Sequence, residues 1–379
     1  MKIPILKLSY SEDDIRFIKN EVEAVLRSGF LTMDSRVHAF EEQFADFCGV
    51  KYAIGTNSGT SSLEIILRAI GVEGKNVVIP SNTYMATPLA AIKAGAKVIF
   101  TECERNNLQM DPEDLKQKIC EDTKAVIIVH IGGMISPRLD EIRKICQNSK
   151  IPLVEDAAHA HGAEYFQTFA GNLGIAGSFS FYPTKVLTTA EGGMITTNDE
   201  DIYKKAIVLR EHGKADHNYN IHTEIGDNWR FSELHAVLGI QQMKKVDYIL
   251  SERRHLAKLY DELLKNVKEL ECIAIPSHVK PSYYKYIVFL PERIKRNDLK
   301  RLLLEKFSIQ LPGEVYSGPC HSQPVFSKYP ETLVNDKEES FPVTDAVCQQ
   351  HVCLPLYPGL KGEEVDYIVN SLKQVLKSL

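Results

Sequence analysis

The sequence predicts an α/β fold, with a mainly parallel central sheet in a large domain and a smaller α+β domain at the C-terminal end. A chain of 379 residues exceeds the size at which a single core usually stops growing. Its first two-thirds alternates short β-branched runs with helical patterns, which is typical of a parallel sheet covered by helices. A helical pattern then runs from Ser232 to about Asn266. We therefore expect an N-terminal arm and large domain over residues 1–248 and a small domain over residues 249–379.

The large domain should contain strands separated by helices. Apolar runs predict the strands Asn76–Pro80, Lys97–Thr101, Ala125–His130, Ile151–Glu155, Ser178–Phe181 and Met194–Thr197. One helix is expected to begin near Gly59 and another to run from Met85 to Ala94. A third should open at Asp111–Pro112, because aspartate is a good N-cap and proline suits the first helical position.

The small domain begins after the long helical pattern. The run YYKYIVFL (Tyr283–Leu290) predicts a strand, and Arg296–Phe307 has the spacing of an amphipathic helix. A stretch rich in Pro, Gly and Ser follows, and a final helix is expected from Gly362. These elements predict an α+β arrangement.

Composition and charge exclude several classes of protein. A net charge of −5 and a pI near 6.2 give no general reason to bind nucleic acid or an anionic membrane. The eight cysteines show no CxxC pair and no zinc-ligand spacing, so we expect reduced thiols and no metal site. The N-terminus lacks the apolar region of a signal peptide, and no apolar run reaches the ~20 residues of a membrane span. These features predict a cytoplasmic protein.

Lys185 is the first candidate for catalysis. It lies in the segment GSFSFYPTKVLTTAEGGM (Gly177–Met194), after a small strand and before an acidic Gly-Gly turn. A lysine whose pKa is lowered by burial or by a neighbouring cation is a useful nucleophile, because its neutral form attacks carbonyl groups. The alternative, a solvated loop lysine, is the commonest state of this residue type.

Asp156 is the second candidate, in the segment IPLVEDAAHAHG (Ile151–Gly162). The segment places Asp156 at the carboxyl end of a strand, where ligands gather in open parallel sheets. An aspartate there could face the ring nitrogen of a pyridine cofactor and keep it protonated, which pyridoxal 5′-phosphate chemistry requires. A helix N-cap is an equally good interpretation of Asp156 alone. His159 could stack on such a ring or be an ordinary loop histidine.

The segment TNSGTSS (Thr56–Ser62) is a candidate phosphate site. Free backbone amides and the helix dipole favour an anion at a helix start. Gly59 allows close backbone approach, and Thr60 and Ser61 can add hydroxyl groups. A capped helix that binds nothing would have the same short pattern.

Taken together, four motifs resemble the DegT/StrS nucleotide-sugar aminotransferases, a branch of the fold-type I pyridoxal phosphate enzymes. They are GTSSL, VEDAAHAHGA, SFSFYPTK…EGGM and GDNWRFSELHAVLG, in the family's order along nearly the whole chain. The stretch FLTMDSRVHAFEEQFADFCGVKYAIGTNSGT also resembles the family's N-terminal part.

The resemblance implies roles for individual residues. Lys185 would hold the cofactor as a Schiff base, and Asp156 would pair with its pyridinium nitrogen. His159 would lie near the ring, and Tyr84 would stack on its outer face. The phosphate would be bound by Gly59, Thr60 and Ser180. Asn228 and Arg230 would reach the active site of a neighbouring subunit, Arg230 gripping a donor carboxylate, so a homodimer is implied.

The same resemblance predicts the reaction. An amino acid, with L-glutamate expected, would donate its amino group to a nucleotide-linked keto-sugar. Glu191, in the sequence Ala190–Gly193, resembles relatives that act at C4 of the sugar, although relatives that aminate cyclitols share this feature. The chain has His130–Met134 (HIGGM) where many relatives have HLYGQ, so the segment that shapes the substrate pocket departs from the family pattern.

Two other functions use the same fold. A pyridoxal phosphate-dependent dehydratase or lyase would turn over a keto-sugar without an amino donor. Relatives with that chemistry replace the lysine with histidine, whereas Lys185 is present here. A catalytically silent regulator would show substituted site residues, and those named above are intact.

Overall fold

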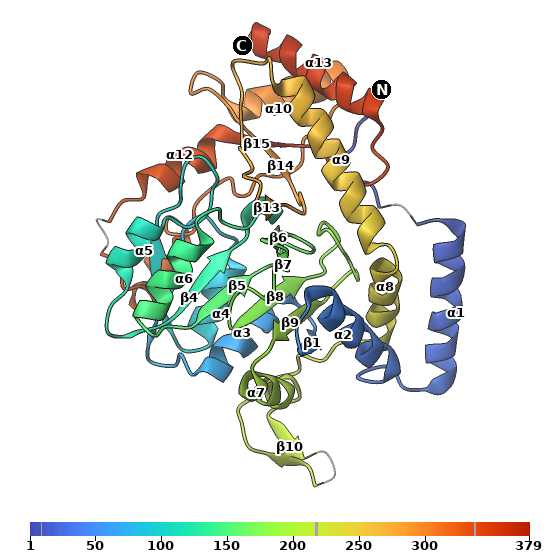
Figure 1. The fold of residues 1–379 in the computed structure, drawn as a ribbon, viewed down its shortest axis with the longest axis vertical. Helices are drawn as coiled ribbons and strands as arrows, with labels where there is room; N and C mark the ends of the chain where they lie inside the picture. Colours follow the sequence, from blue (N-terminus) through green and yellow to red (C-terminus); the bar gives the residue numbers. More distant parts are fainter. Residues whose placement is uncertain (9, 217–218, 337–338) are drawn as a thin grey trace.

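The computed structural model describes residues 1–8, 10–216, 219–336 and 339–379, and Figure 1 shows the arrangement of their elements. A seven-stranded sheet has the order β1-β9-β8-β5-β4-β2-β3. Only β9 runs antiparallel to its neighbours, β1 and β8. The expected mainly parallel sheet is therefore confirmed. Its strands are β1 (Tyr52–Thr56), β2 (Asn76–Pro80), β3 (Lys97–Thr101), β4 (Thr123–Val129), β5 (Leu153–Asp156), β8 (Ala176–Ser180) and β9 (Gly193–Thr197).

Helices cover both faces of this sheet, because successive strand side chains point to opposite sides. In β4, Ala125 and Ile127 pack into one hydrophobic cluster, while Val126 and Ile128 pack into another. The first cluster includes α3 (Gly59–Ile70), α4 (Ala86–Lys93) and α7 (Glu200–Arg210). The second includes α2 (Ser35–Cys48), α5 (Pro112–Lys118), α6 (Leu139–Asn148) and α8 (Glu233–Met243). The result is a three-layered large domain.

A third hydrophobic cluster forms the C-terminal part, which lies at the top of Figure 1. It contains β14 (Tyr286–Phe289) between β12 (Glu271–Cys272) and β15 (His351–Leu354), with α9 (Val246–Leu264), α10 (Arg296–Phe307) and α13 (Gly362–Ser378) against them. Ile3 from the N-terminus also packs there and bridges to Ile309. The expected domain boundary after residue 248 falls inside α9 and stays a prediction.

The remaining elements are short or peripheral. Helix α1 (Glu12–Ser28) packs on α8 at the edge of the molecule, and the hairpin β10 (Lys214–Asp216) and β11 (Ile221–His222) projects from the opposite end to the small domain (Figure 1). The others are β6 (Glu164–Tyr165), β7 (Thr168–Phe169), β13 (Val279–Lys280), α11 (Pro324–Lys328), α12 (Pro342–Gln350) and the 3-10 turns Ile131–Gly133 and Pro330–Thr332. None of the described helices has the length and apolar character to cross a membrane.

The long helical pattern from Ser232 is divided in the structure. It forms α8 and α9, which are separated at Lys244 and Lys245. The helical pattern is therefore present in the structure as two successive helices with a break between them. The amide of Lys245 donates to the carbonyl of Gln242 and so closes a turn where the helix would have continued.

Candidate active site

Lys185 lies in a cavity of about 350 Å³ at the carboxyl ends of the parallel strands. It follows β8 through a turn in which its amide donates to the carbonyl of Tyr182. Its Nζ atom lies 4.9 Å from the ring centroid of Tyr284. The cavity also contains seven of the nine predicted site residues when Lys185 is counted, the others being Gly59, Thr60, Tyr84, Asp156, His159 and Ser180. Residues far apart in the sequence therefore meet as predicted.

The Lys185 amine has a lowered pKa. Burial lowers it from 10.5 to about 8; the nearby Asp156 carboxylate opposes this effect and the Lys285 ammonium adds to it. At neutral pH a pKa of about 8 leaves roughly one amine in ten unprotonated, whereas the ordinary value leaves fewer than about one in a thousand. Lys185 is thus prepared to act as a nucleophile and as a proton carrier.

Asp156 ends β5 and is 6% exposed. The Thr87 hydroxyl donates to its Oδ2 atom at 2.7 Å, and the Ala158 amide donates to Oδ1 at 3.2 Å. No cation among the described residues forms an ion pair with it, and burial raises its pKa. A buried carboxylate without a cationic partner is costly, so a protonated ring nitrogen would supply the missing charge.

The opposite corner of the cavity is built around Gly59. The helix α3 begins at this residue, and Ser58 caps it by accepting from the Ser61 amide. A Cβ atom on Gly59 would lie 2.9 Å from the Cβ atom of Ser180, so only glycine fits against the end of β8. The first amides of a helix lack intrahelical acceptors, and those of Gly59 and Thr60 therefore remain available for an anion.

His159 is held between the two domains. Its ring stacks on Tyr284 with the centroids 4.1 Å apart, and its Nε2 atom lies 3.0 Å from the Tyr316 hydroxyl. Burial, together with the Lys185 ammonium, lowers its pKa well below the ordinary value, so the ring is neutral. Its Nδ1 atom is buried without a partner in the described structure. This unpartnered nitrogen indicates that His159 is a ligand-binding residue rather than a core histidine with all its hydrogen bonds made.

Two further residues lie at the cavity's rim. The Tyr84 ring is 62% exposed, and its centroid lies 5.8 Å from that of Tyr316. Glu191 is exposed on the loop before β9 and also lines the cavity. Both side chains are therefore accessible to a substrate.

Asn228 and Arg230 do not line this cavity. Asn228 is exposed, and its carbonyl accepts from the Asn57 side chain at 3.3 Å. The Arg230 guanidinium forms an ion pair with Glu211 at 2.7 Å. Within one chain these residues thus stay apart from Lys185, and their expected role in a neighbouring subunit's site stays a prediction.

The structure adds three site residues that were not predicted. They are Thr87, which binds Asp156, and Tyr284 and Tyr316, which contact His159 from the small domain. Thr87 lies in the first turn of α4, whose predicted start could have directed attention to it. Tyr284 belongs to a run that was interpreted only as a strand, and Tyr316 lies in the Pro- and Gly-rich stretch, so no local pattern identified either.

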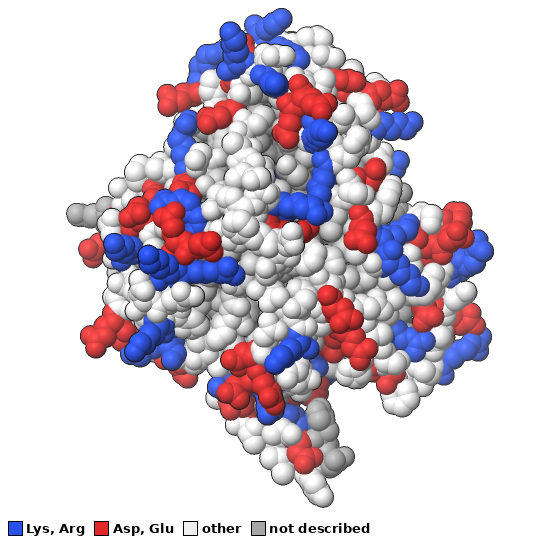
Figure 2. Space-filling view, in the orientation of Figure 1, with Lys and Arg blue, Asp and Glu red and all other residues white. Residues whose placement is uncertain are grey.

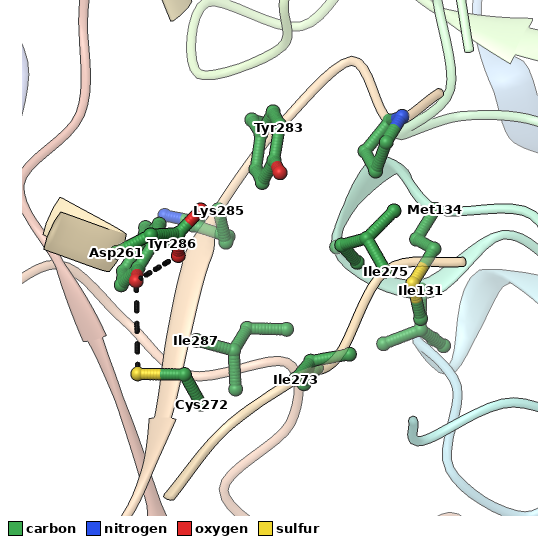
Figure 3. Close-up of a pocket in the computed structure, with 12 residues that line it drawn as sticks. Ile131, Met134, Asp261, Cys272, Ile273, Ile275, Tyr283, Lys285, Tyr286 and Ile287 are labelled. Atoms are coloured by element: carbon green, nitrogen blue, oxygen red, sulfur yellow. Dashed lines mark hydrogen bonds between the residues drawn. The ribbon is translucent and has the colours of Figure 1, made fainter. Parts of the chain in front are cut away.

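A separate small cavity of about 30 Å³ lies where the two domains meet (Figure 3). Ile131, Met134, Ile273, Ile275 and Ile287 make much of its wall apolar. The Tyr286 hydroxyl in its wall donates to Asp261 at 2.6 Å. None of the predicted site residues lines it, and its volume is suited to about one water molecule. The cavity around Lys185 is therefore the better candidate for chemistry.

A model of the DegT/DnrJ/EryC1/StrS aminotransferase family matches residues 12–373. The chain belongs to this family. A relative from Aneurinibacillus thermoaerophilus, dTDP-3-amino-3,6-dideoxy-alpha-D-galactopyranose transaminase, is 33% identical, covering 94% of each chain. GDP-perosamine synthase of Escherichia coli O157:H7 is 30% identical over 89% of each chain. The crystal structure of S. venezuelae DesV in complex with a ketimine intermediate superimposes with a TM-score of 0.90 at 27% identity, covering 99% of this chain and 98% of that one.

Membership of this family makes the chain a sugar aminotransferase that uses pyridoxal 5′-phosphate. The cavity fits that cofactor on three points. The Gly59 corner provides free amides for the phosphate, Asp156 is a buried carboxylate without a cation, and Lys185 is an amine with a lowered pKa. The recognised resemblance and the fold-type I architecture are thus confirmed.

Proposed function

We propose that this aminotransferase moves the amino group of an amino acid, with L-glutamate as the expected donor, to the C4 keto group of a nucleotide-linked sugar. The observation that supports it best is that the Lys185 amine, with its lowered pKa, and the buried Asp156 carboxylate line one cavity. Nucleotide-linked sugars are named in both relatives described above, which supports this substrate class.

The residues of the chain divide the chemistry between them. When bound, pyridoxal phosphate supplies a protonated ring that accepts the electron pair of a bond broken at the donor's Cα atom. Asp156 keeps the ring nitrogen protonated by placing a negative charge beside it. Lys185 removes the proton from the donor's Cα atom and holds it for return, as general base and then general acid. Its pKa of about 8 suits both roles near neutral pH.

Substrate recognition involves residues at the rim. Glu191 lines the cavity. We propose C4 rather than C3 because Glu191 and the two glycines after it resemble the segment of relatives that act at C4. The relative from Aneurinibacillus thermoaerophilus is named for a 3-amino sugar, so a substrate screen must include both positions. A keto-cyclitol is the second candidate acceptor. Arg230, contributed by the second subunit of a homodimer, is the expected anchor for the donor carboxylate.

The visible absorption spectrum of the purified holoenzyme tests the donor half of this reaction. L-glutamate is added without any sugar, and the cofactor band is expected to shift to that of the pyridoxamine form. The Lys185→Ala variant should lose the shift. Conversion of the shifted form is then followed with nucleotide-linked keto-sugars bearing the keto group at C4 or C3, and with a keto-inositol, with product identification by mass spectrometry and NMR.

Each outcome selects one function. Amination at C4 supports the proposal, and amination only at C3 or only of the cyclitol corrects its substrate. If no amino acid converts the cofactor to the pyridoxamine form, but the holoenzyme still consumes a keto-sugar, the protein is a dehydratase or lyase. A protein that binds no cofactor is a silent relative.

A further inference from the structure

A second chamber adjoins the cavity of the cofactor. It has a volume of about 450 Å³ and lies between N-terminal residues 6–8 and 10–11, helices α8 and α9, and Lys185. A smaller cavity of about 90 Å³ shares Leu6 and Arg253 with it and reaches Tyr284 and Lys285. Lys185 also lines the cofactor cavity, so all three spaces meet around this residue and Tyr284. A substrate could extend from the cofactor into this chamber.

The described lining of the chamber is cationic. It contains no aspartate or glutamate, whereas its basic residues are Lys7, Lys185, Lys244, Lys245 and Arg253. The smaller cavity, which shares Arg253 with it, adds Lys285 and also has no described acidic residue in its lining. Lys245 forms an ion pair with Asp14, and Lys244 lies over the Phe17 ring at 3.3 Å from its centroid. Figure 2 shows lysine and arginine gathered in the middle of this face, between the small and large domains. Their positive charge is suited to an anion.

Arg253 is the most deeply placed of these cations, at 2% exposed on α9. Its Nη1 atom donates to the carbonyls of Tyr283 at 3.0 Å and Leu356 at 3.2 Å. Its Nε atom is buried without any partner, and it forms no ion pair with a described carboxylate. Burial lowers its pKa only to about 10, so the guanidinium stays charged at neutral pH. A buried charge of this kind normally has a counter-ion.

Lys285 also lacks a counter-ion among the described residues. Its Nζ atom lies 5.0 Å from the Tyr284 ring centroid, and it forms no ion pair with a described residue. The Glu314 carboxylate, which raises the pKa of Lys285, forms its ion pair with the Lys300 amine instead, at 2.7 Å. Asp261, which lines the small cavity of Figure 3 together with Lys285, is occupied by the Tyr286 hydroxyl. Burial and the Arg253 charge lower the Lys285 pKa.

We propose that Arg253 and Lys285 bind the diphosphate of the nucleotide-linked substrate, where the chamber beside Lys185 meets the smaller cavity. This inference rests on the proposed function. The Lys185 and Lys285 amines lie 4.9 and 5.0 Å from the Tyr284 ring centroid, so the proposed diphosphate site and the cofactor lysine lie beside the same aromatic ring. The chamber's volume lies in the range of about 300–1,000 Å³ that is usual for small-molecule ligands, and it leaves room for a nucleotide beyond the phosphates. The donor's carboxylate is the other oxyanion that these cations could hold.

Titration calorimetry of the holoenzyme with inorganic pyrophosphate tests the site, because bound cofactor already fills the Gly59 corner. The Lys285→Met variant should bind pyrophosphate at least about tenfold more weakly. Lys258→Met is the matched control, since Lys258 is exposed on the same α9 helix as Arg253, and its affinity should stay within about twofold of the parent value. Arg253→Lys should weaken binding while retaining the charge.

Two further measurements separate the possible outcomes. Lys285→Met should unfold at the same or a higher temperature than the parent, because it removes an unpaired, partly buried charge, so weak binding cannot be attributed to misfolding. The glutamate concentration that converts the cofactor is compared between Lys285→Met and the parent, each at one pH unit above its own Lys185 pKa, because the substitution also raises that pKa. Unaltered pyrophosphate binding overturns the proposal, and a higher glutamate requirement assigns the cations to the donor carboxylate instead. A parent enzyme that glutamate never converts refutes the proposed function while the calorimetry still reports on the anion site.

Discussion

The proton on Lys185 controls how fast the protein captures its cofactor. Only the neutral amine attacks the aldehyde of pyridoxal phosphate, and the Lys185 pKa is lowered to about 8 by burial, with a contribution from Lys285. Between about pH 6 and pH 8 the capture rate of the apoenzyme should therefore rise about tenfold per pH unit and then level off. Stopped-flow absorbance after mixing with pyridoxal phosphate measures this rate.

The Lys285→Met variant provides the control for this pH dependence. Removing a positive charge makes protonation of Lys185 easier, so its pKa rises and the plateau should begin at a higher pH. A rate that still rises up to about pH 10 in the parent enzyme would show an ordinary lysine and contradict the expectation.

The charge of Asp156 is the second property to test at this scale. Asp156→Asn keeps the shape and can still accept from the Thr87 hydroxyl, but it removes the negative charge facing the ring nitrogen. The cofactor should still bind to Lys185, while the rate of conversion by glutamate should fall by about 10²–10³-fold, a magnitude typical of a lost electrostatic contribution. Thr87→Val is the milder comparison, because it removes one hydrogen bond and keeps the carboxylate. Equal rates in Asp156→Asn and the parent would refute this role.

At the scale of elements, the start of α3 is the feature that a single methyl group can test. Gly59→Ala would place a Cβ atom 2.9 Å from that of Ser180 and 3.1 Å from the Phe179 carbonyl, so the helix must move away from β8. We expect pyridoxal phosphate to bind at least about tenfold more weakly, since the amides at the helix start move with the helix. Gly362→Ala is a matched control, because Gly362 also begins a helix and its Cβ would meet only Leu259 at 3.8 Å. Fluorescence titration of the apoenzymes compares the two variants.

Sequence patterns predicted the elements whose structure is decided locally. The helix Arg296–Phe307 and the strands β2 and β3 begin and end where they were expected, because a clear apolar period or a compact β-branched run marks each one. The break between α8 and α9 was missed because apolar residues continue at helical spacing across it and neither Pro nor Gly marks it. The antiparallel direction of β9 also has no local signal, because the side chains of a strand alternate in the same way in either direction.

The candidate site shows the same division. Asp156, Ser180 and the start of α3 could be brought together in advance, because the carboxyl ends of parallel strands share one edge of the sheet. Tyr284 and Tyr316 could not, because their contacts with His159 join segments more than 100 residues apart and depend on how the small domain packs. The uncompensated charges of Arg253 and Lys285 also depend on which acids lie nearby, and this is decided only in the folded molecule.

At the scale of the whole molecule, the predicted homodimer makes a claim about shared active sites. If Arg230 acts on a neighbouring subunit's Lys185, then Arg230→Ala and Lys185→Ala should each be inactive alone, although each retains one half of the site. Unfolding and refolding the two variants together in equal amounts should restore about one quarter of the parent activity, since half of the dimers are mixed and each has one intact site. Activity that stays absent in the mixture, with dimers shown by sedimentation, would place Arg230 outside the partner's site.

The strand order of the large sheet also affects the timing of protein synthesis. Within the sheet, β1 lies at the edge and pairs only with β9, although β9 begins at Gly193, 137 residues after the end of β1 at Thr56. A ribosome adding about 5–20 residues per second takes roughly 7–27 seconds to cover that interval. Until β9 is made, β1 has no partner strand within the sheet, and Gly59 can meet Ser180 only after most of that interval has been translated. Cofactor capture needs both this contact and Lys185, so it is a late or post-translational event in the life of the enzyme.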